Sequence, residues 1–430
     1  MSRLLIKHAR VIDPSQRLDE GLDVLVVDGR IARLAERIEE RGAEVIDAAG
    51  LMATPGFIDV HTHLREPGFE YKETIASGAA AALAGGFTAV CCMPNTQPVN
   101  DSAAVTEFIR KRAEEAGAAR VYPIGAISKG QAGEELSEMG EMVRAGAVAV
   151  SDDGRPVRHA YLMRRALEYS LLFGIPVVDH CEDPTLVAGG VMHEGAVSTR
   201  LGLRGIPAAA EEVVVARDVI LAGLTGARLH LAHLSTRQSL EWVRRAKSQG
   251  LAVSCEVTPH HLALTDTAVL ESSYDTNFKM NPPLRSAEHV AALLEGVLDG
   301  TVDCLATDHA PHHADEKALE FDLAPFGVVG LETAVPVTYD LFVRQHKLPL
   351  TRFVALWSTN PARLFSLPGG TLKVGSVADM TLLDSEARLP VNPDKFLSKS
   401  RNTPFAGRRL RGWPVATILG GKVVWRRERR

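Results

Sequence analysis

The central part of the chain alternates short apolar runs with longer Ala- and Leu-rich segments, and this alternation limits the possible folds more than any other feature. The runs typical of buried parallel strands are Phe57–His61, Thr88–Met93, Val121–Gly125, Val148–Ser151, Pro176–His180, Leu229–His233, Ala252–Val257 and Val302–Thr307. Amphipathic stretches such as Ser102–Ala116 and Arg158–Phe173 lie between them. Eight strands alternating with helices predict an α/β fold, a (β/α)8 TIM-like barrel over residues 55–365. A doubly wound open sheet is the alternative.

The two ends of the chain have the pattern of a small β module. Its strand candidates are Leu4–Ile12, Asp23–Val27 and Arg30–Leu34 in the first segment, and Asp379–Leu383, Ala416–Leu419 and Lys422–Trp425 in the second. Asp28-Gly29 and Gly420-Gly421 separate neighbouring candidates and are typical of hairpin turns. Because an inserted domain brings its flanking segments together, we expect residues 1–54 and 366–430 to form one composite β-sandwich domain.

Composition narrows the class of protein. The chain has 430 residues, of which 46% are apolar and 23% charged, enough for a large buried core. A net charge of −5 favours neither nucleic acid nor an anionic membrane as a partner. The five cysteines have no pairing pattern, and the start MSRLLIKHARVID lacks the features of a signal peptide. We therefore expect a cytoplasmic protein that does not bind nucleic acid or membranes.

Metal-capable side chains follow several of the predicted strands, at the end of a barrel where active sites lie. They are His61 and His63 on strand one, Asp152-Asp153 after strand four, His180 after strand five, His233 after strand six, and Asp308 after strand eight. A lone His-x-His is more often a polar strand face, but the joint placement favours a metal site. Imidazole and carboxylate ligands suit zinc, with a second ion close by. Periodicity alone does not decide between Asp152 and Asp153.

Four motifs resemble those of the dihydroorotases, in particular the long-chain type I branch of the amidohydrolase superfamily. They are Val60–Gly68 (VHTHLREPG), Met93–Thr96 (MPNT), Lys279–Arg285 (KMNPPLR) and Ala306–His312 (ATDHAPH). The resemblance runs in order over essentially the whole chain, whereas the His-x-His element alone is shared by the superfamily. It implies a metal-dependent hydrolase barrel with two Zn²⁺ per subunit and a composite β module.

The resemblance also implies a role for individual residues. His61, His63 and Asp308 would bind one zinc ion, and His180 and His233 the other. Hydantoinases and related enzymes place a carboxylated lysine on strand four as the bridging ligand. This chain has Asp152-Asp153 there, as type I dihydroorotases do, and the family register selects Asp153 as the bridge. For the substrate, Arg65, Asn95 and His312 would hold a carboxylate, Asn281 would contact the ring, and the backbone of Phe326 and Gly327 would bind the ring edge.

The reaction implied is the reversible cyclisation of N-carbamoyl-L-aspartate to L-dihydroorotate in de novo pyrimidine (UMP) biosynthesis. A metal-bridging hydroxide would be the nucleophile, with Asp308 as general base and then acid. The charged segment 312–327 is interpreted as a mobile lid. The family implies a homodimer, and a complex with aspartate transcarbamoylase stays open. The alternatives are another cyclic amidohydrolase, an allantoinase or hydantoinase, or a non-catalytic dihydroorotase-like partner of aspartate transcarbamoylase.

Overall fold

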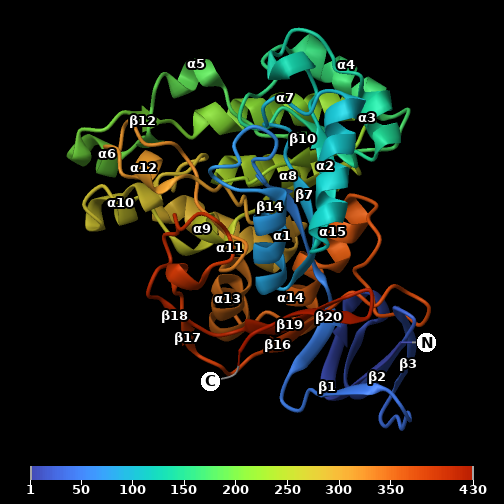
Figure 1. Ribbon diagram of the computed structural model, residues 1–430. Helices are drawn as coiled ribbons and strands as arrows, with labels where there is room; N and C mark the ends of the chain where they lie inside the picture. The colour runs from blue at the N-terminus through green and yellow to red at the C-terminus, as the bar shows by residue number, and fades with distance from the viewer. Residues whose placement is uncertain (1, 429–430) are drawn as a thin grey trace.

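A barrel of parallel strands lies at the centre of the computed structural model, which describes residues 2–428 (Figure 1). Its eight strands follow one another in space as they do along the chain. They are β6 (Phe57–Thr62), β7 (Phe87–Cys92), β8 (Arg120–Gly125), β9 (Ala149–Ser151), β10 (Val177–Asp179), β13 (Leu229–Leu231), β14 (Val253–Val257) and β15 (Cys304–Leu305). Each expected strand coincides with one of these elements, so the predicted fold class is confirmed.

The last strand returns to the first, which distinguishes a barrel from an open sheet. Thr62, at the end of β6, forms a parallel bridge with His309, which follows β15. The His63 N–H donates to the His309 carbonyl over 2.8 Å. Asp59 joins the same two strands from inside β6, since its carboxylate accepts from the Thr307 N–H (3.1 Å) and the Thr307 hydroxyl. The alternative of a doubly wound sheet is therefore excluded.

Helices cover the outside of the barrel, as the amphipathic stretches predict (Figure 1). The main ones are α1 (Ile75–Ala84), α2 (Ala103–Ala116), α3 (Met139–Ala145), α4 (Ala160–Ser170), α7 (Ala209–Thr225), α8 (Arg237–Ser248), α11 (Ala287–Asp299) and α14 (Leu350–Trp357). Shorter helices lie in the connections between these elements: α5 (Pro184–Val187), α6 (Ala196–Leu201), α9 (Pro259–Ala263), α10 (Thr267–Glu271), α12 (Ala314–Lys317), α13 (Ala334–Thr338) and α15 (Thr359–Leu364). No helix within residues 2–428 is long and apolar enough to cross a membrane.

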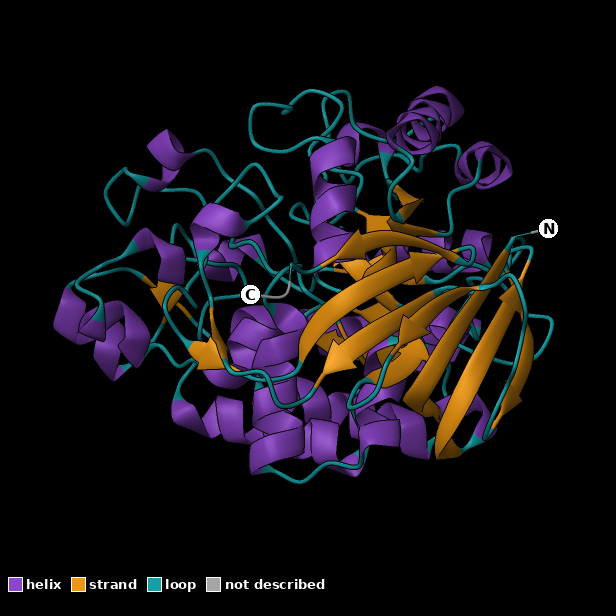
Figure 2. Ribbon diagram, turned by 60° about the horizontal axis from the view of Figure 1, so that its bottom comes forward, coloured by secondary structure: helices purple, strands orange, loops and turns teal. Residues whose placement is uncertain are grey.

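The N- and C-terminal segments share a second sheet (Figures 1 and 2). Its strands are β1 (Arg3–Asp13), β2 (Leu18–Val27), β3 (Arg30–Ala35), β4 (Glu44–Asp47), β5 (Met52–Pro55), β16 (Met380–Asp384), β19 (Trp413–Leu419) and β20 (Lys422–Arg426). Antiparallel pairing of β5 with β16 joins the two ends of the chain. The long strand β1 pairs with β4 along its first half and with β5 along its second half, so hydrogen bonding is continuous through the composite β module. Domain limits at 54/55 and 365/366 stay a proposal.

Two sets of apolar side chains divide the barrel into an interior and an outer layer. Along β7, Ala89 and Cys91 pack with the interior set, whereas Val90 and Cys92 pack against the helices. The same alternation holds in β13 and β14, so that His230 and Glu256 lie on the interior side. A β-bulge between Asp59 and Thr62 interrupts it in β6. His61 consequently faces the interior directly after the interior residue Val60.

Candidate active site

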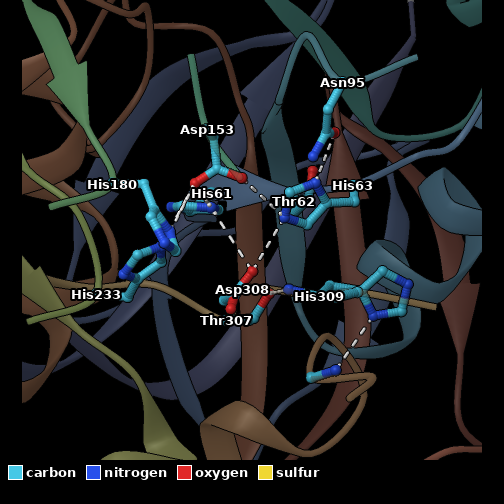
Figure 3. Close-up of polar contacts among 12 residues, drawn as sticks. His61, Thr62, His63, Asn95, Asp153, His180, His233, Thr307, Asp308 and His309 are labelled. Atoms are coloured by element: carbon cyan, nitrogen blue, oxygen red, sulfur yellow. Dashed lines mark hydrogen bonds and ion pairs between the residues drawn. The ribbon is translucent and has the colours of Figure 1, made fainter. Parts of the chain in front are cut away.

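Six side chains from five strand ends meet at the carboxyl end of the barrel, and Figure 3 shows them pointing toward one another. His63 Nε2 lies 3.1 Å from Asp308 Oδ1 and 3.5 Å from Asp153 Oδ2. His61 Nε2 is 3.4 Å from Asp153 Oδ1 and 3.6 Å from Asp308 Oδ1. On the other side of Asp153, His180 Nδ1 and His233 Nε2 approach its Oδ1 to 3.5 and 3.4 Å. The structure thus brings together all the expected metal ligands, His61, His63, Asp153, His180, His233 and Asp308.

The backbone adopts positive φ angles at several of the residues that follow these strands. His233 and Asp308 have left-handed conformations with φ of 30° and 46°, and Arg65 has φ of 63°. Non-glycine residues adopt this region at a cost of about 1–3 kcal/mol each, in turns and at functional sites. Ordinary strand alternation after Ala232 would turn His233 away from the interior; the positive φ returns its ring to the cluster.

The two neighbouring aspartates after β9 have different surroundings. The Asp152 carboxylate accepts from the backbone N–H groups of Ile127 (2.8 Å) and Ser128 (3.1 Å) and from the Ser128 hydroxyl. It therefore fastens the end of β9 to the loop after β8. Asp153 faces the histidines instead. Burial raises its pKa, but the His61 charge and hydrogen bonds from the rings bring that pKa well below the usual value, so Asp153 is a carboxylate.

The donor set fits divalent metal ions. Single ligand atoms of His61, His63 and Asp308 lie within 4.8 Å of one another, and so do those of His61, Asp153 and His233. His61 Nε2 is buried and has no hydrogen-bond partner although it points into the cluster. A buried nitrogen lone pair without a donor is costly unless a ligand satisfies it. Imidazole nitrogens with bridging carboxylates are typical ligands of zinc and similar ions, so the residues present match a metal cofactor.

Three residues beside the cluster were expected to hold a substrate carboxylate. The Asn95 Oδ1 accepts from His63 Nδ1 over 2.9 Å, which leaves the Asn95 amide N–H2 as a donor. Arg65 donates to the Pro311 carbonyl over 3.2 Å, and one terminal nitrogen lies 3.4 Å from His312 Nε2. Burial and the nearby cationic charges lower the pKa of His312 to about 2, so its ring is neutral. The 2.8 Å contact of His312 Nε2 with the Phe326 carbonyl places the ring proton on Nε2.

The expected ring-binding residues lie further along the same rim. Asn281 donates to Glu182 Oε2 over 2.7 Å, and its own Oδ1 is buried without a hydrogen-bond partner. The Gly327 N–H donates to the Lys279 carbonyl over 2.9 Å. The Gly327 carbonyl accepts from Asn402 Nδ2 over 3.1 Å. The Phe326 carbonyl and both backbone groups of Gly327 are therefore engaged within the protein in this state.

The segment 312–327, interpreted above as a lid, is anchored by a buried lysine. Lys317 Nζ donates to the carbonyls of Pro325 (3.0 Å), Gly327 (3.1 Å) and Lys279 (3.4 Å). Burial lowers the pKa of Lys317 to about 7. A cavity of about 370 Å³, lined in part by Lys317 and His312, lies beside this anchor. The lid remains a proposal about motion, and the anchor is the contact that opening would break.

Sequence reasoning missed two residues that contact the cluster. Glu256 Oε1 lies 2.7 Å from His61 Nδ1, and Glu182 Oε2 lies 3.8 Å from His180 Nε2. His230 is also buried, and its Nε2 lies 3.1 Å from Glu256 Oε2. The available signal was a charged residue at an interior position of the apolar run Ala252–Val257. A carboxylate within a buried strand requires donors, and two of its three donors, the His61 ring and the His233 N–H, belong to expected metal ligands.

Known proteins match the chain over nearly its full length. A family model described as dihydro-orotase-like matches residues 50–239. A dihydroorotase of Anaeromyxobacter dehalogenans is 58% identical over 422 residues, covering 98% of this chain and 97% of the relative. A dihydroorotase of Pelotomaculum thermopropionicum is 57% identical over 422 residues, covering 98% of each.

Solved structures share the fold at lower identity. The L-hydantoinase (dihydropyrimidinase) of Arthrobacter aurescens superposes with a TM-score of 0.88 at 26% identity, covering 99% of this chain and 96% of that one. The dihydropyrimidinase of Brevibacillus agri gives 0.85 at 22% identity, covering 99% and 95%. These neighbours share the amidohydrolase barrel. The identities of 57–58% to dihydroorotases, more than twice those to the hydantoinases, place the chain among the dihydroorotases. The chain belongs to the dihydroorotase family.

Proposed function

We propose that the protein is a zinc-dependent dihydroorotase that interconverts N-carbamoyl-L-aspartate and L-dihydroorotate in pyrimidine biosynthesis. The meeting of four histidines and two aspartates beside the partly buried Arg65 is the observation on which this proposal rests. The identity of 58% to a dihydroorotase over 98% of the chain supports the same reaction. The protein is thus a cyclic amide hydrolase that acts on a small molecule.

Two zinc ions per chain are part of the proposal. His61, His63 and Asp308 would hold one, His180 and His233 the other, and Asp153 would bridge them, in line with its contacts to both sides of the cluster. Bound zinc polarises an amide carbonyl and lowers the pKa of a coordinated water to about 7.

Asp308 is proposed as the residue that moves the proton. In ring opening, water adds to the ring carbonyl carbon, the carbon–nitrogen bond breaks, and the ring nitrogen must gain the proton that water loses. The Asp308 carboxylate is charged and lies in the cluster beside His61 and His63, so it accepts this proton and returns it to the departing nitrogen. Ring closure is the reverse: the ureido nitrogen loses its proton to Asp308, and water leaves the carboxyl carbon.

The carboxylate of the substrate is proposed to bind Arg65, Asn95 and His312. A guanidinium offers paired donors to a carboxylate, and the Asn95 amide adds a single one. The His312 ring adds another once its Nε2 proton leaves the Phe326 carbonyl, to which it is donated in this state. Lys72 Nζ lies 3.4 Å from His312 Nδ1, so a second positive charge borders this position. These groups favour a ring that carries a carboxylate over hydantoin or allantoin. Asn281 and the backbone of Phe326 and Gly327 are proposed to contact the ring itself.

The remaining expectations concern the enzyme in the cell. We propose a cytoplasmic location, which fits the five free and buried cysteines. A homodimer, and assembly with aspartate transcarbamoylase, are proposed from the family alone. Light scattering of the purified chain, with and without that enzyme, tests both.

The decisive experiment is an assay of ring opening and closure on zinc-loaded protein, with hydantoin and allantoin as competing substrates. We expect turnover of dihydroorotate, its loss on treatment with a chelator, and its return with added zinc. Zinc analysis should give two ions per chain in active protein. Folded, zinc-loaded protein that turns over none of the three substrates would instead identify a non-catalytic scaffold, and preference for hydantoin would overturn the substrate assignment.

A further inference from the structure

The side of His61 that faces away from the cluster is held by a second carboxylate. His61 Nδ1 lies 2.7 Å from Glu256 Oε1, while its Nε2 points at Asp153 and Asp308. A carboxylate only accepts hydrogen bonds, so this contact places the ring proton on Nδ1. With a metal ion bound, the ring is neutral and its Nε2 lone pair is directed into the cluster.

Glu256 is itself fixed by three donors. Besides His61, its Oε1 accepts from the His233 backbone N–H over 3.3 Å, and its Oε2 accepts from His230 Nε2 over 3.1 Å. The carboxylate is fully buried within the barrel. Burial of an ion costs several kcal/mol unless hydrogen bonds replace its water. Two of the three donors belong to proposed metal ligands, His61 and His233, so the charge sits where it touches both halves of the cluster.

His230 ties Glu256 to the next interior layer of the barrel. Its Nδ1 lies 2.8 Å from the Ser254 hydroxyl, and its Nε2 faces Glu256. Ser254 precedes Glu256 by two residues on β14, so both side chains lie on the interior face. When the serine donates to Nδ1, the proton of His230 is on Nε2, the position from which it donates to Glu256.

We propose that Glu256, supported by His230, is a positioning residue that presents the Nε2 lone pair of His61 to the metal. The inference rests on the proposed metal centre. It assigns to that centre a residue that contributes to zinc affinity without being one of the six ligands. Partners of this kind fix the tautomer and orientation of a ligating histidine and raise its basicity. Their loss typically weakens metal binding by about 10- to 100-fold.

The test is Glu256→Gln, which keeps the shape of the side chain and removes its charge. Glu332→Gln is the matched control. Glu332 is a partly buried carboxyl side chain, and it accepts from the backbone N–H groups of Leu397 and Ser398, away from the cluster. Zinc affinity is measured by competition with a chelator, and folding of the zinc-free proteins by circular dichroism and thermal melting. We expect affinity to fall by about 10-fold or more for Glu256→Gln and to stay within about twofold for Glu332→Gln.

A second measurement needs no change at position 256. In wild-type protein with ¹⁵N-labelled histidine, the His61 ring, assigned with His61→Gln, should carry a proton on Nδ1 both with and without zinc. An Nε2–H tautomer in the zinc-free protein would overturn the inference, and so would a folded Glu256→Gln variant with wild-type affinity. Wild-type protein that binds no zinc would refute the proposed metal centre instead.

A further outcome concerns Cys304, whose sulfur lies with His230 and Glu256 in a group of potential ligands. A third zinc ion that Cys304→Ser abolishes would make Glu256 a ligand and would also overturn the positioning role.

Discussion

Gly327→Ala tests the geometry of the substrate pocket most directly. Gly327 has φ of +127°, outside the left-handed well that other residues visit. A Cβ at this position would lie 2.7 Å from the Ala310 Cβ and 3.1 Å from His312 Nε2. His312 is held in place by its bond to the Phe326 carbonyl, so the added methyl group must displace either the ring or the loop.

The expected cost has two parts. The backbone conformation is strained for alanine by about 1–3 kcal/mol. Overpacking against Ala310 adds about 1–3 kcal/mol. We therefore expect the free energy of unfolding to fall by about 2–6 kcal/mol. Displacement of His312 prevents its ring from exchanging the Phe326 carbonyl for the substrate carboxylate as acceptor. The hydrogen bond lost to the substrate is worth about 1.5–3 kcal/mol, which corresponds to a rise in KM of about 10- to 100-fold.

Urea denaturation and steady-state kinetics on dihydroorotate measure the two effects separately. Gly117→Ala is the control, because Gly117 has φ of +59° at the end of α2 and open space around the added Cβ. It carries the strain of a positive φ without the overlap, and we expect about 1–2 kcal/mol and an unchanged KM. If Gly327→Ala matched this control in both stability and KM, the close packing of Gly327 against His312 would be refuted.

Three further predictions concern single side chains. Asp308→Asn should lower the rate of ring closure by about 10²- to 10⁴-fold with the fold retained, and a near-wild-type rate would exclude it as the proton carrier. Lys317→Met removes the buried anchor of segment 312–327, so amide exchange there should accelerate by about 10-fold or more; unchanged exchange would show that the anchor does not hold the segment. Burial raises the pKa of Glu332 to about 7 from 4.5, so the folded state keeps a proton that the unfolded chain releases, and stability falls as pH rises between these values. In denaturation curves from pH 4.5 to 8, Glu332→Gln should remove up to about 3 kcal/mol of the change in unfolding free energy with pH. An unchanged pH dependence in this variant would contradict the raised pKa of Glu332.

Much of the fold could be predicted because its signals are local. Parallel strands covered on both faces appear as continuous apolar runs, so even the two-residue strand β15 was found within Val302–Thr307. The turn Asp28-Gly29 has φ of 47° and 77°, as a two-residue hairpin requires, and these residue types adopt such angles easily. The candidate ligands could be found for the same reason, since each follows directly from the end of a strand.

The contacts between those ligands had no local signal. Asp152 and Asp153 are neighbours of the same type, and only the loop after β8, whose N–H groups bind Asp152, leaves Asp153 for the cluster. The bulge in β6 and the positive φ of His233 likewise depend on how neighbouring strands pair. Glu256 was missed because its partner His61 lies 195 residues away in the chain.

The sequence by itself determined which segments are strands, where each strand ends, and which chemical groups stand at those ends, because side-chain alternation and backbone preference act over a few residues. Only the tertiary structure decided which atoms of those groups face one another. Closure of the barrel sets the register between strands far apart in the chain, and that register places one ring nitrogen of His61 beside Glu256 and the other among the candidate ligands.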